Sequence, residues 1–255
     1  MGTRSGLAYE AIGSGYASLR RAEPTWEQAV RQALAGAVSV VNIGAGSGSY
    51  EPADQSVVAV EPSTVMIDQR PPGSAPSLRA VAEHLPFGPR SFDAALAVLT
   101  VHHWTDPVAG LEEMRRVARR QVVVTWDPTL FAENFWFARD YLAEALERET
   151  TLATLRITTQ VLGPDSRVLV LPVPARCQDG FFAAYWRRPE AYLDPAVRAA
   201  ISGIALLPDV VVKRAVAKLA NDLESGRWQA TYTDLLARES LDVGYRMVVH
   251  DAKAT

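Results

Sequence analysis

Residues 41–48 decide the fold, and they read Val-Asn-Ile-Gly-Ala-Gly-Ser-Gly. The run 38–43 that leads into them is rich in β-branched residues, which predicts a buried strand. Gly44, Gly46 and Gly48 then allow the backbone to turn sharply and to approach a ligand closely, because glycine carries no Cβ. The stretch therefore predicts a strand that ends in a ligand-binding turn.

An acidic residue follows at the end of the next predicted strand, 57–60, where Glu61 stands. A carboxylate at this place can accept hydrogen bonds from both hydroxyls of a ribose, as in many adenosine-binding α/β folds. The Gly-x-Gly-x-Gly form, with Ser49 after it, lacks the last glycine or alanine of a dinucleotide loop. The pattern favours S-adenosylmethionine (SAM) over NAD, and a glycine turn without a ligand is the alternative.

The segments around this stretch alternate between the two kinds of secondary structure. Further strands are predicted at 78–81, 92–100 and 121–126, and helices at 24–35, 64–69 and 107–119, with Thr25 and Asp106 as N-caps. Strands that are nearly all apolar and alternate with helices indicate a parallel sheet covered on both faces. Ligands bind such sheets at the carboxyl ends of the strands. Beyond residue 126 we expect strands at 167–173 and 241–250, and a helix at 208–224.

The composition restricts the classes of function. The chain has 255 residues, of which 48% are hydrophobic and 22% charged, and this composition is globular. A net charge of −3 gives no general attraction for nucleic acid. No apolar run approaches the roughly 20 residues that cross a bilayer, and the first residues lack the apolar core of a signal peptide. We expect a cytoplasmic protein without nucleic-acid or membrane partners, whose oligomeric state the sequence leaves open.

Four blocks of sequence together resemble one family. They are residues 41–48; residues 60–63 with Met66; residues 82–87 followed by 91–93; and residues 99–104 with Asp106 and the helix after it. In this order, over about half of the chain, they resemble the class I SAM-dependent methyltransferases, in particular the small-molecule, type 11-like branch. The resemblance implies a Rossmann-like, mostly parallel seven-stranded sheet with helices on both faces and extra C-terminal helices. It implies one domain, with a helical lid at 1–36, a SAM-binding core at 37–127 and a substrate-facing part at 128–255 that holds the last strands.

The resemblance also assigns the parts of SAM to particular residues. The methionine and ribose portions would contact Gly44, Ala45, Gly46 and Gly48, and Glu61 would hold the ribose hydroxyls. Adenine would contact Pro62, Met66, Ala82 and Glu83, and the floor near the sulfonium would consist of Leu99 and Thr100. The segment with Tyr16 and Arg20 is similar to a Tyr-x-x-x-Arg element that closes over the cofactor, and an arginine there could pair with the SAM carboxylate.

Three features of the sequence depart from the family pattern. Asn42 stands where an acidic residue is commoner, and Val81 where an adenine-binding aspartate is frequent. Residues 49–54 leave little room for the usual first helix. We therefore expect a cofactor site that is more open at this place or covered by another segment.

The chemistry that SAM supplies requires little of the protein. The sulfonium makes the methyl group electrophilic, so the protein mainly aligns a nucleophile with it. A base is needed only when the nucleophile carries a proton that must leave. His102 and His103 follow the fourth strand and titrate near neutrality, so they are the candidate bases, with His103 expected near SAM. Packing roles for both are the alternative. The four histidines show no metal-ligand spacing, which predicts no metal.

Aromatic residues recur at helical intervals in the C-terminal part. Core packing explains most of them, and we expect Trp136, Tyr185 and Trp186 to contact an apolar small-molecule substrate. Cys177, the single cysteine, is expected to be a buried structural thiol, and Asp179 is expected to form a turn.

The sequence therefore predicts transfer of a methyl group from SAM to an O, N or C atom of a small molecule in biosynthesis. The transfer would be a direct displacement without metal that leaves S-adenosylhomocysteine (SAH). A non-catalytic SAM-binding regulatory or partner protein is the alternative. The predicted pI of about 5.9 counts against an RNA or protein methyltransferase, and the loop form counts against an NAD-dependent oxidoreductase.

Overall fold

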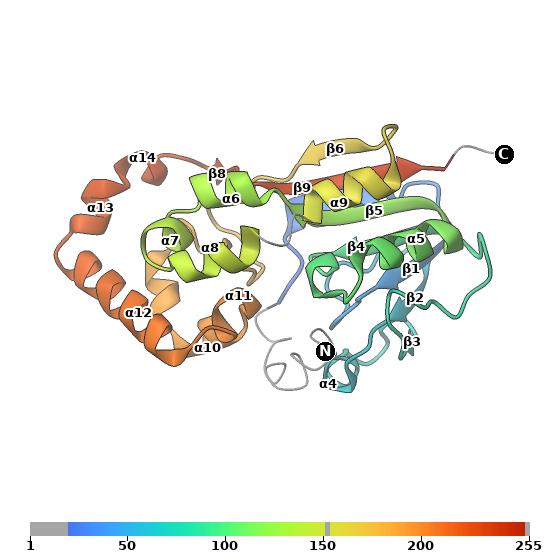
Figure 1. The fold of residues 1–255 in the computed structure, drawn as a ribbon, viewed down its shortest axis with the longest axis horizontal. Helices are drawn as coiled ribbons and strands as arrows, with labels where there is room; N and C mark the ends of the chain where they lie inside the picture. The colour runs from blue at the N-terminus through green and yellow to red at the C-terminus, as the bar shows by residue number, and fades with distance from the viewer. Residues whose placement is uncertain (1–19, 151–153, 253–255) are drawn as a thin grey trace.

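The structure, a computed structural model, describes residues 20–150 and 154–252. A sheet with helices packed on it forms one side of the molecule, and a group of short helices forms the other (Figure 1). The helices of the described chain include none that is long and apolar enough to cross a membrane.

A seven-stranded sheet with the order β3-β2-β1-β4-β5-β9-β6 forms the framework. The strands from β3 to β5 pair in parallel, and β9 runs antiparallel between β5 and β6. This confirms the expected Rossmann-like, mostly parallel sheet. The bounds are β1 Ser39–Ile43, β2 Ser56–Val60, β3 Ser77–Leu78, β4 Phe92–Val98, β5 Ala118–Trp126, β6 Arg167–Val170 and β9 Tyr245–Asp251.

Helices cover both faces of the sheet because successive strand residues point to opposite sides. On one face, Val40 and Val122 join the cluster that contains Trp26 of α3 (Pro24–Ala33). On the other face, the neighbouring strand residues pack with α5 (Pro107–Val117) and α9 (Thr154–Leu162). The short α4 (Thr64–Asp68) follows β2. The strands are therefore buried on both sides, as their apolar sequences predict.

Helix caps set two of these elements. Asp106 caps α5 as predicted, since its carboxylate accepts from the backbone N of Val108 and Ala109. The predicted cap Thr25 is wrong: Glu23 is the N-cap of α3, and it accepts from the backbone N of Thr25. Pro24 occupies the first helical position and fixes the start of the helix, so the cap lies two residues before Thr25.

The connection from β1 to β2 contains turns and no helix, as the short 49–54 segment predicts. Three expected strands differ from the structure. The 78–81 strand is the two-residue β3, and the 241–250 strand is divided into β8 (Ser240–Leu241) and β9 by Gly244, which has a φ of +99°. The 167–173 strand ends at Val170, and β7 (Val173–Pro174) pairs with β8 instead.

Two long connections build the group of short helices (Figure 1). The first joins β5 to α9, and the second joins β6 to β9. Their apolar side chains share one cluster with α3 and the sheet face beneath it. The bounds are α6 Pro128–Asn134, α7 Trp136–Asp140 and α8 Ala143–Thr150 in the first, and η2 Pro189–Leu193, α10 Pro195–Ala199, α11 Ser202–Ala205, α12 Asp209–Glu224, α13 Arg227–Thr231 and α14 Thr233–Leu236 in the second.

Candidate active site

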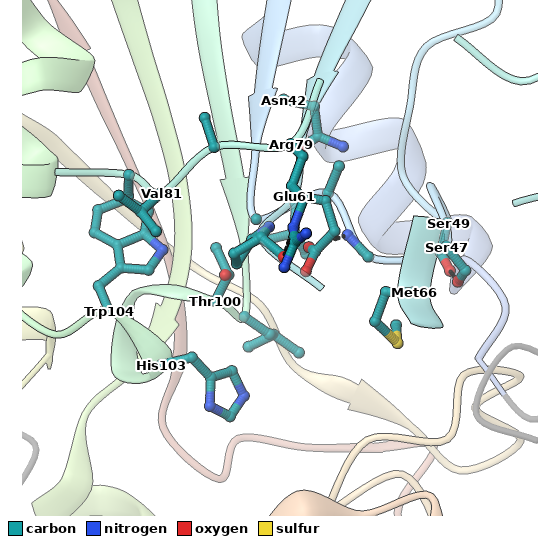
Figure 2. A pocket seen from close by; sticks show the side chains of 18 of the residues that line it. Asn42, Ser47, Ser49, Glu61, Met66, Arg79, Val81, Thr100, His103 and Trp104 are labelled. Atoms are coloured by element: carbon teal, nitrogen blue, oxygen red, sulfur yellow. Dashed lines mark hydrogen bonds between the residues drawn. The ribbon is translucent and has the colours of Figure 1, made fainter. Parts of the chain in front are cut away.

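A cavity of about 630 Å³ opens at the carboxyl ends of β1, β2, β3 and β4 (Figure 2). This is the edge at which parallel sheets bind ligands. Most of the predicted cofactor residues line it: Arg20, Gly44, Ala45, Gly46, Glu61, Pro62, Met66, Ala82, Glu83, Leu99 and Thr100. Gly48 does not line it, and Tyr16 lies outside the described residues.

Two positions in the turn after β1, Gly44 and Gly46, lack side chains for steric reasons. A Cβ on Gly44 would lie 2.0 Å from the Oγ1 of Thr100, and the residue has a φ of +67°. Gly46 has a φ of +52°, and a Cβ there would lie 3.3 Å from the Cε of Met66. L-residues avoid this backbone region, so both positions favour glycine. The backbone of the turn therefore faces the cavity directly.

Glu61 is nearly buried beside the turn, with 6% of its surface exposed. Its Oε2 accepts from the backbone N of Gly46 at 2.9 Å, and its Oε1 accepts from the backbone N of Ser63 at 3.0 Å. A carboxylate has about four lone-pair sites, so these bonds leave capacity to accept further donors. The carboxylate and the side-chain-free turn thus fit the ribose and methionine parts of SAM.

The carboxylate that β1 lacks is supplied from the neighbouring loop. Asn42 donates from Nδ2 to Oε1 of Glu51 at 3.0 Å, and Oε2 of Glu51 pairs with Arg70 at 2.7 Å. Arg70 also donates to the carbonyl of Gly46 at 3.3 Å. A Cβ on Gly48 would lie 3.0 Å from Arg70, so Gly48 makes room for this network. Sequence reasoning missed the network, because no local motif links its members.

The wall of the cavity also includes Arg79, Val81 and Trp104 (Figure 2), together with Glu83. Glu83 accepts from the backbone N of Asp106 at 3.0 Å. A Cβ on Gly110 would lie 2.5 Å from the indole ring of Trp104, so this glycine makes room for the ring. Of these residues, only Glu83 is predicted from the sequence to contact the cofactor.

Arg20 lines the cavity, and its partner is a protein carboxylate. Its Nε lies 2.6 Å from Oδ1 of Asp179, whose side chain is fully buried. Tyr50 donates to Oδ2 of Asp179 at 2.8 Å, and burial together with the charge of Asp179 raises the pKa of Tyr50 well above its usual value. Arg20 therefore forms an ion pair with Asp179, and its expected pairing with the SAM carboxylate stays a prediction. Asp179 also accepts from the backbone N of Gly180, which is the turn that its sequence context predicts.

The two histidines lie in the short helix η1 (Val101–His103), directly after β4. His103 lines the cavity (Figure 2). The ring of His102 lies 4.6 Å from the ring of Trp126 in an edge-on arrangement and lines a smaller, neighbouring cavity. Of the two candidate bases, His103 is the one placed beside the cofactor residues.

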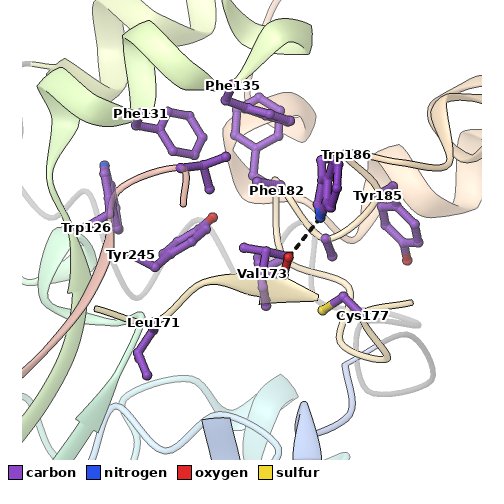
Figure 3. Packing of buried hydrophobic residues seen from close by; sticks show 14 of the residues in the cluster. Trp126, Phe131, Phe135, Leu171, Val173, Cys177, Phe182, Tyr185, Trp186 and Tyr245 are labelled. Carbon is purple, nitrogen blue, oxygen red and sulfur yellow. Dashed lines mark hydrogen bonds between the residues drawn. The ribbon is translucent and has the colours of Figure 1, made fainter. Parts of the chain in front are cut away.

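The three aromatic residues predicted to contact substrate line neither of these cavities. Trp136 donates from Nε1 to the carbonyl of Trp186 at 2.8 Å. Trp186 donates to the carbonyl of Val173 at 3.0 Å (Figure 3). Both are fully buried, and Tyr185 is buried beside them. The prediction is corrected for Trp136 and Trp186, because their indole N–H groups bond to backbone inside the core. The predicted substrate contact of Tyr185 stays a prediction. The smaller cavity is lined instead by Trp126, Phe131, Phe181, Phe182 and Tyr245.

The single cysteine of the chain lies in the core. Cys177 is buried, and burial together with the charge of Glu23 raises the pKa of its thiol. Within residues 20–150 and 154–252, no three His, Cys, Asp or Glu side chains are grouped so that they could hold a metal ion.

Comparisons with known proteins agree with this geometry. Residues 41–124 match a family model described as a methyltransferase domain. A solved structure from Anabaena variabilis, described as a methyltransferase from an antibiotic biosynthesis pathway, superposes with a TM-score of 0.84. It is 29% identical in sequence, and the match covers 91% of this chain and 98% of that one. A comparison with curated proteins finds no match.

Two more distant structures share the fold. A SAM-dependent methyltransferase from Thermotoga maritima is 24% identical over 66% of this chain and 84% of its own, with a TM-score of 0.52. The [4+2]-cyclase SpnF is 14% identical over 98% of this chain and 96% of its own, with a TM-score of 0.50.

The sheet order, the glycine turn with its carboxylate, and the matched domain agree with one another. SAM is the cofactor that this site takes, and the chain carries a methyltransferase domain with the class I, Rossmann-like fold.

Proposed function

We propose that this enzyme transfers the methyl group of SAM to a nucleophilic atom of a small molecule by direct displacement, without a metal. The observation that carries the proposal is the side-chain-free turn beside Glu61, in a cavity whose wall also includes His103. The cofactor and a candidate base therefore share one cavity. A volume of about 630 Å³ lies in the usual range of small-molecule sites.

The cofactor residues of this proposal follow from their places around the cavity. The turn of Gly44, Ala45 and Gly46 would hold the methionine part, and Glu61 would accept from the ribose hydroxyls. Pro62 and Met66 would cover adenine, with Ala82 and Glu83 at its edge, and Leu99 and Thr100 would form the floor. Bound SAM supplies a methyl group on a positively charged sulfur.

In the reaction, the acceptor's lone pair forms a bond to the methyl carbon while the carbon–sulfur bond breaks and its electrons stay on sulfur. His103 would take the acceptor's proton when that atom carries one, because its ring lies at the cavity wall after β4. The protein also orients the two reactants, and orientation of this kind contributes about 7–11 kcal/mol.

Two observations favour a small acceptor. The site is recessed at the sheet edge rather than spread over a surface, and the net charge of −3 gives no general attraction for a polyanion. The Anabaena variabilis relative is described as part of an antibiotic biosynthesis pathway, which supports a biosynthetic metabolite as acceptor. Residues 37–127 would then form the cofactor part of one domain, and residues 128–255 would form its substrate-facing part.

The test measures SAH formed from SAM by the purified protein with a panel of phenols, amines and carbon acids. His103→Gln should lower kcat by about 10²- to 10⁴-fold on acceptors that carry a proton, with unchanged SAH affinity. His102→Gln is the matched variant, and it should affect kcat less because His102 packs on Trp126. Equal kcat values in both variants would show that His103 is not the base.

The alternative is a SAM-binding protein that transfers no methyl group. The fold permits it, since a [4+2]-cyclase has the same fold. Tight SAM binding without SAH formation across the whole panel would favour this alternative.

A further inference from the structure

A chain of three hydrogen-bonded side chains ends at the cofactor cavity. Arg70 donates to Oε2 of Glu51 at 2.7 Å, and Asn42 donates from Nδ2 to Oε1 of the same carboxylate at 3.0 Å. The side chains of Arg70 and Glu51 are 5% and 10% exposed. Of the three residues, Asn42 is the one that lines the cavity (Figure 2). The nearly buried ion pair therefore reaches the cavity through Asn42.

The bond from Nδ2 fixes the orientation of the Asn42 amide. Because Glu51 is paired with Arg70, its carboxylate is ionised and can only accept hydrogen bonds. The amide nitrogen of Asn42 must therefore face Glu51. A flipped amide would place its oxygen against the Glu51 carboxylate, where neither group could donate. Oδ1 of Asn42 is thus an acceptor that the protein holds in one position.

This oxygen can be reached from the cavity. Asn42 is 4% exposed, and within residues 20–150 and 154–252 no group donates to its Oδ1. Oδ1 is also not among the atoms that the described chain encloses without a hydrogen-bond partner. The accessible surface that it retains belongs to the cavity that Asn42 lines. The cavity therefore presents a fixed acceptor at the end of β1, and a ligand has to bring a donor.

The cofactor offers donors of three kinds. In the proposed placement, Glu61 accepts from the ribose hydroxyls, and the adenine amino group lies near Glu83. The third donor is the α-ammonium group of the methionine part, which would lie at the turn of Gly44 and Gly46. That turn begins two residues after Asn42. The ammonium group is therefore the donor that fits Oδ1 of Asn42.

We propose that Glu51 sets the cofactor specificity of this site through Asn42. Glu51 holds the amide so that Oδ1 accepts from the α-ammonium group, and its negative charge polarises the amide and strengthens that bond. Glu51 is a positioning residue, because Asn42 makes the contact. The acceptor that meets the ammonium group is neutral, and the charge stands one residue behind it. This inference rests on the cofactor placement of the proposed function.

The experiment compares SAH with deamino-SAH, in which hydrogen replaces the α-amino group, by calorimetric titration of the purified chain. Wild type should bind SAH about 10- to 100-fold more tightly, the range for one hydrogen bond to a charged group. Asn42→Leu keeps the approximate size of the side chain and removes its oxygen, so the ratio of the two affinities should fall to near one. Asn221→Leu, at an exposed position of α12, is the control and should keep the wild-type ratio.

Glu51→Gln tests the positioning role. A neutral amide at this position can donate to Asn42 as well as accept from it, so the Asn42 amide loses its fixed orientation. The ratio should fall at least about 3-fold below that of wild type, in protein that circular dichroism shows to be folded.

Asn42→Asp adds a readout that depends on pH. It places a second carboxylate beside Glu51, and repulsion keeps a proton on one of the two at low pH. As the pH rises from about 5 to 8, this proton leaves, and the added negative charge attracts the ammonium group. The preference for SAH should therefore increase with pH in this variant and stay constant in wild type.

The outcomes separate this inference from the function on which it rests. A wild-type ratio near one, or a ratio that Asn42→Leu and Glu51→Gln leave unchanged, overturns the role of both residues even if the enzyme forms SAH. An equal loss of affinity for both ligands would likewise overturn it, because that loss reports packing alone. If the ratio changes as described but no acceptor yields SAH, the inference stands and the proposed methyl transfer fails. Absence of SAH binding by wild type would overturn both.

Discussion

The carboxylate of Glu61 is oriented by two backbone N–H groups, those of Gly46 and Ser63. Both donors belong to segments that the fold fixes, the turn after β1 and the N-cap of α4. The carboxylate is therefore positioned before any ligand arrives, and a preorganised acceptor loses little conformational freedom when it binds.

Glu61→Ala removes this acceptor. We expect SAH affinity to fall by about 1–3 kcal/mol, the cost of losing charge-assisted hydrogen bonds. Calorimetric titration with SAH measures the change, and Glu112→Ala, at an exposed position of α5, is the control. Unchanged affinity in Glu61→Ala would remove Glu61 from the site.

The reactivity of the Cys177 thiol tests whether the segment near the Arg20–Asp179 ion pair is buried. Burial raises the pKa of its thiol, and so does the charge of Glu23, so the reactive thiolate is scarce at pH 8 in the folded protein. We expect iodoacetamide to modify native protein far more slowly than protein in denaturant, where the thiol regains its ordinary pKa. Mass spectrometry over time measures both rates, and similar rates would contradict the burial.

Part of the site could be predicted residue by residue. Gly44, Gly46 and Glu61 carry a local pattern whose spacing the chain geometry dictates, and they do line the cavity. The pairing of Arg20 with Asp179 spans 159 positions and has no local signal. Trp126 and Trp136 are the same residue type, and their sequence does not show which of them lines a cavity. The fold places Trp126 at the smaller cavity and Trp136 in the core.

The connection between β1 and β2 is stabilised by an ion pair in place of a helix. Arg70 and Glu51 pair with side chains that are 5% and 10% exposed, and their bonds reach Asn42 on one side and the Gly46 carbonyl on the other. The side chains of Arg70, Glu51 and Asn42 therefore stabilise the glycine turn.

Glu51→Gln tests this element. The change leaves the charge of Arg70 buried without its partner, which typically costs about 3–5 kcal/mol in unfolding free energy. Asp54→Asn is the control, since its ion pair with Arg31 is exposed and should contribute less than about 1 kcal/mol. Chemical denaturation measures both, and equal costs would show that the buried network does not support the turn.

Among the elements, those with strong local signals were predictable. The apolar strands and the Asp106 cap of α5 are where the sequence places them. The strands β3 and β6 are shorter than predicted, because their ends depend on pairing at the sheet edges rather than on their own residues. The short helices of the C-terminal part have little periodicity, and their packing against one another decides them.

At the scale of the whole molecule, the two sides meet beside the cofactor cavity. Asp179, from the long connection after β7, pairs with Arg20 before α3 and accepts from Tyr50 in the loop after β1. Three segments that are distant in sequence thus share one buried charge pair. This contact therefore fixes the position of the cofactor cavity relative to the smaller cavity, which the short helices help to line.

Asp179→Asn weakens that junction. We expect a loss of about 3 kcal/mol or more in unfolding free energy, because Arg20 keeps a nearly buried charge without its partner. Hydrogen exchange should become faster in residues 171–200 before it does in β4 and β5. Asp234→Asn, at an exposed position in α14, should change neither quantity. Uniform exchange in both variants would show that the junction does not couple the two sides.

Titration of the purified protein with SAH by calorimetry tests the central claim most directly, with NAD and the variant Gly46→Val as controls. We predict one SAH bound per chain, no binding of NAD, and no SAH binding by the folded variant, because a valine at this positive-φ position would fill the turn that faces the cavity. SAH binding of wild-type strength by folded Gly46→Val, or binding of NAD in place of SAH, would contradict the assignment of the site.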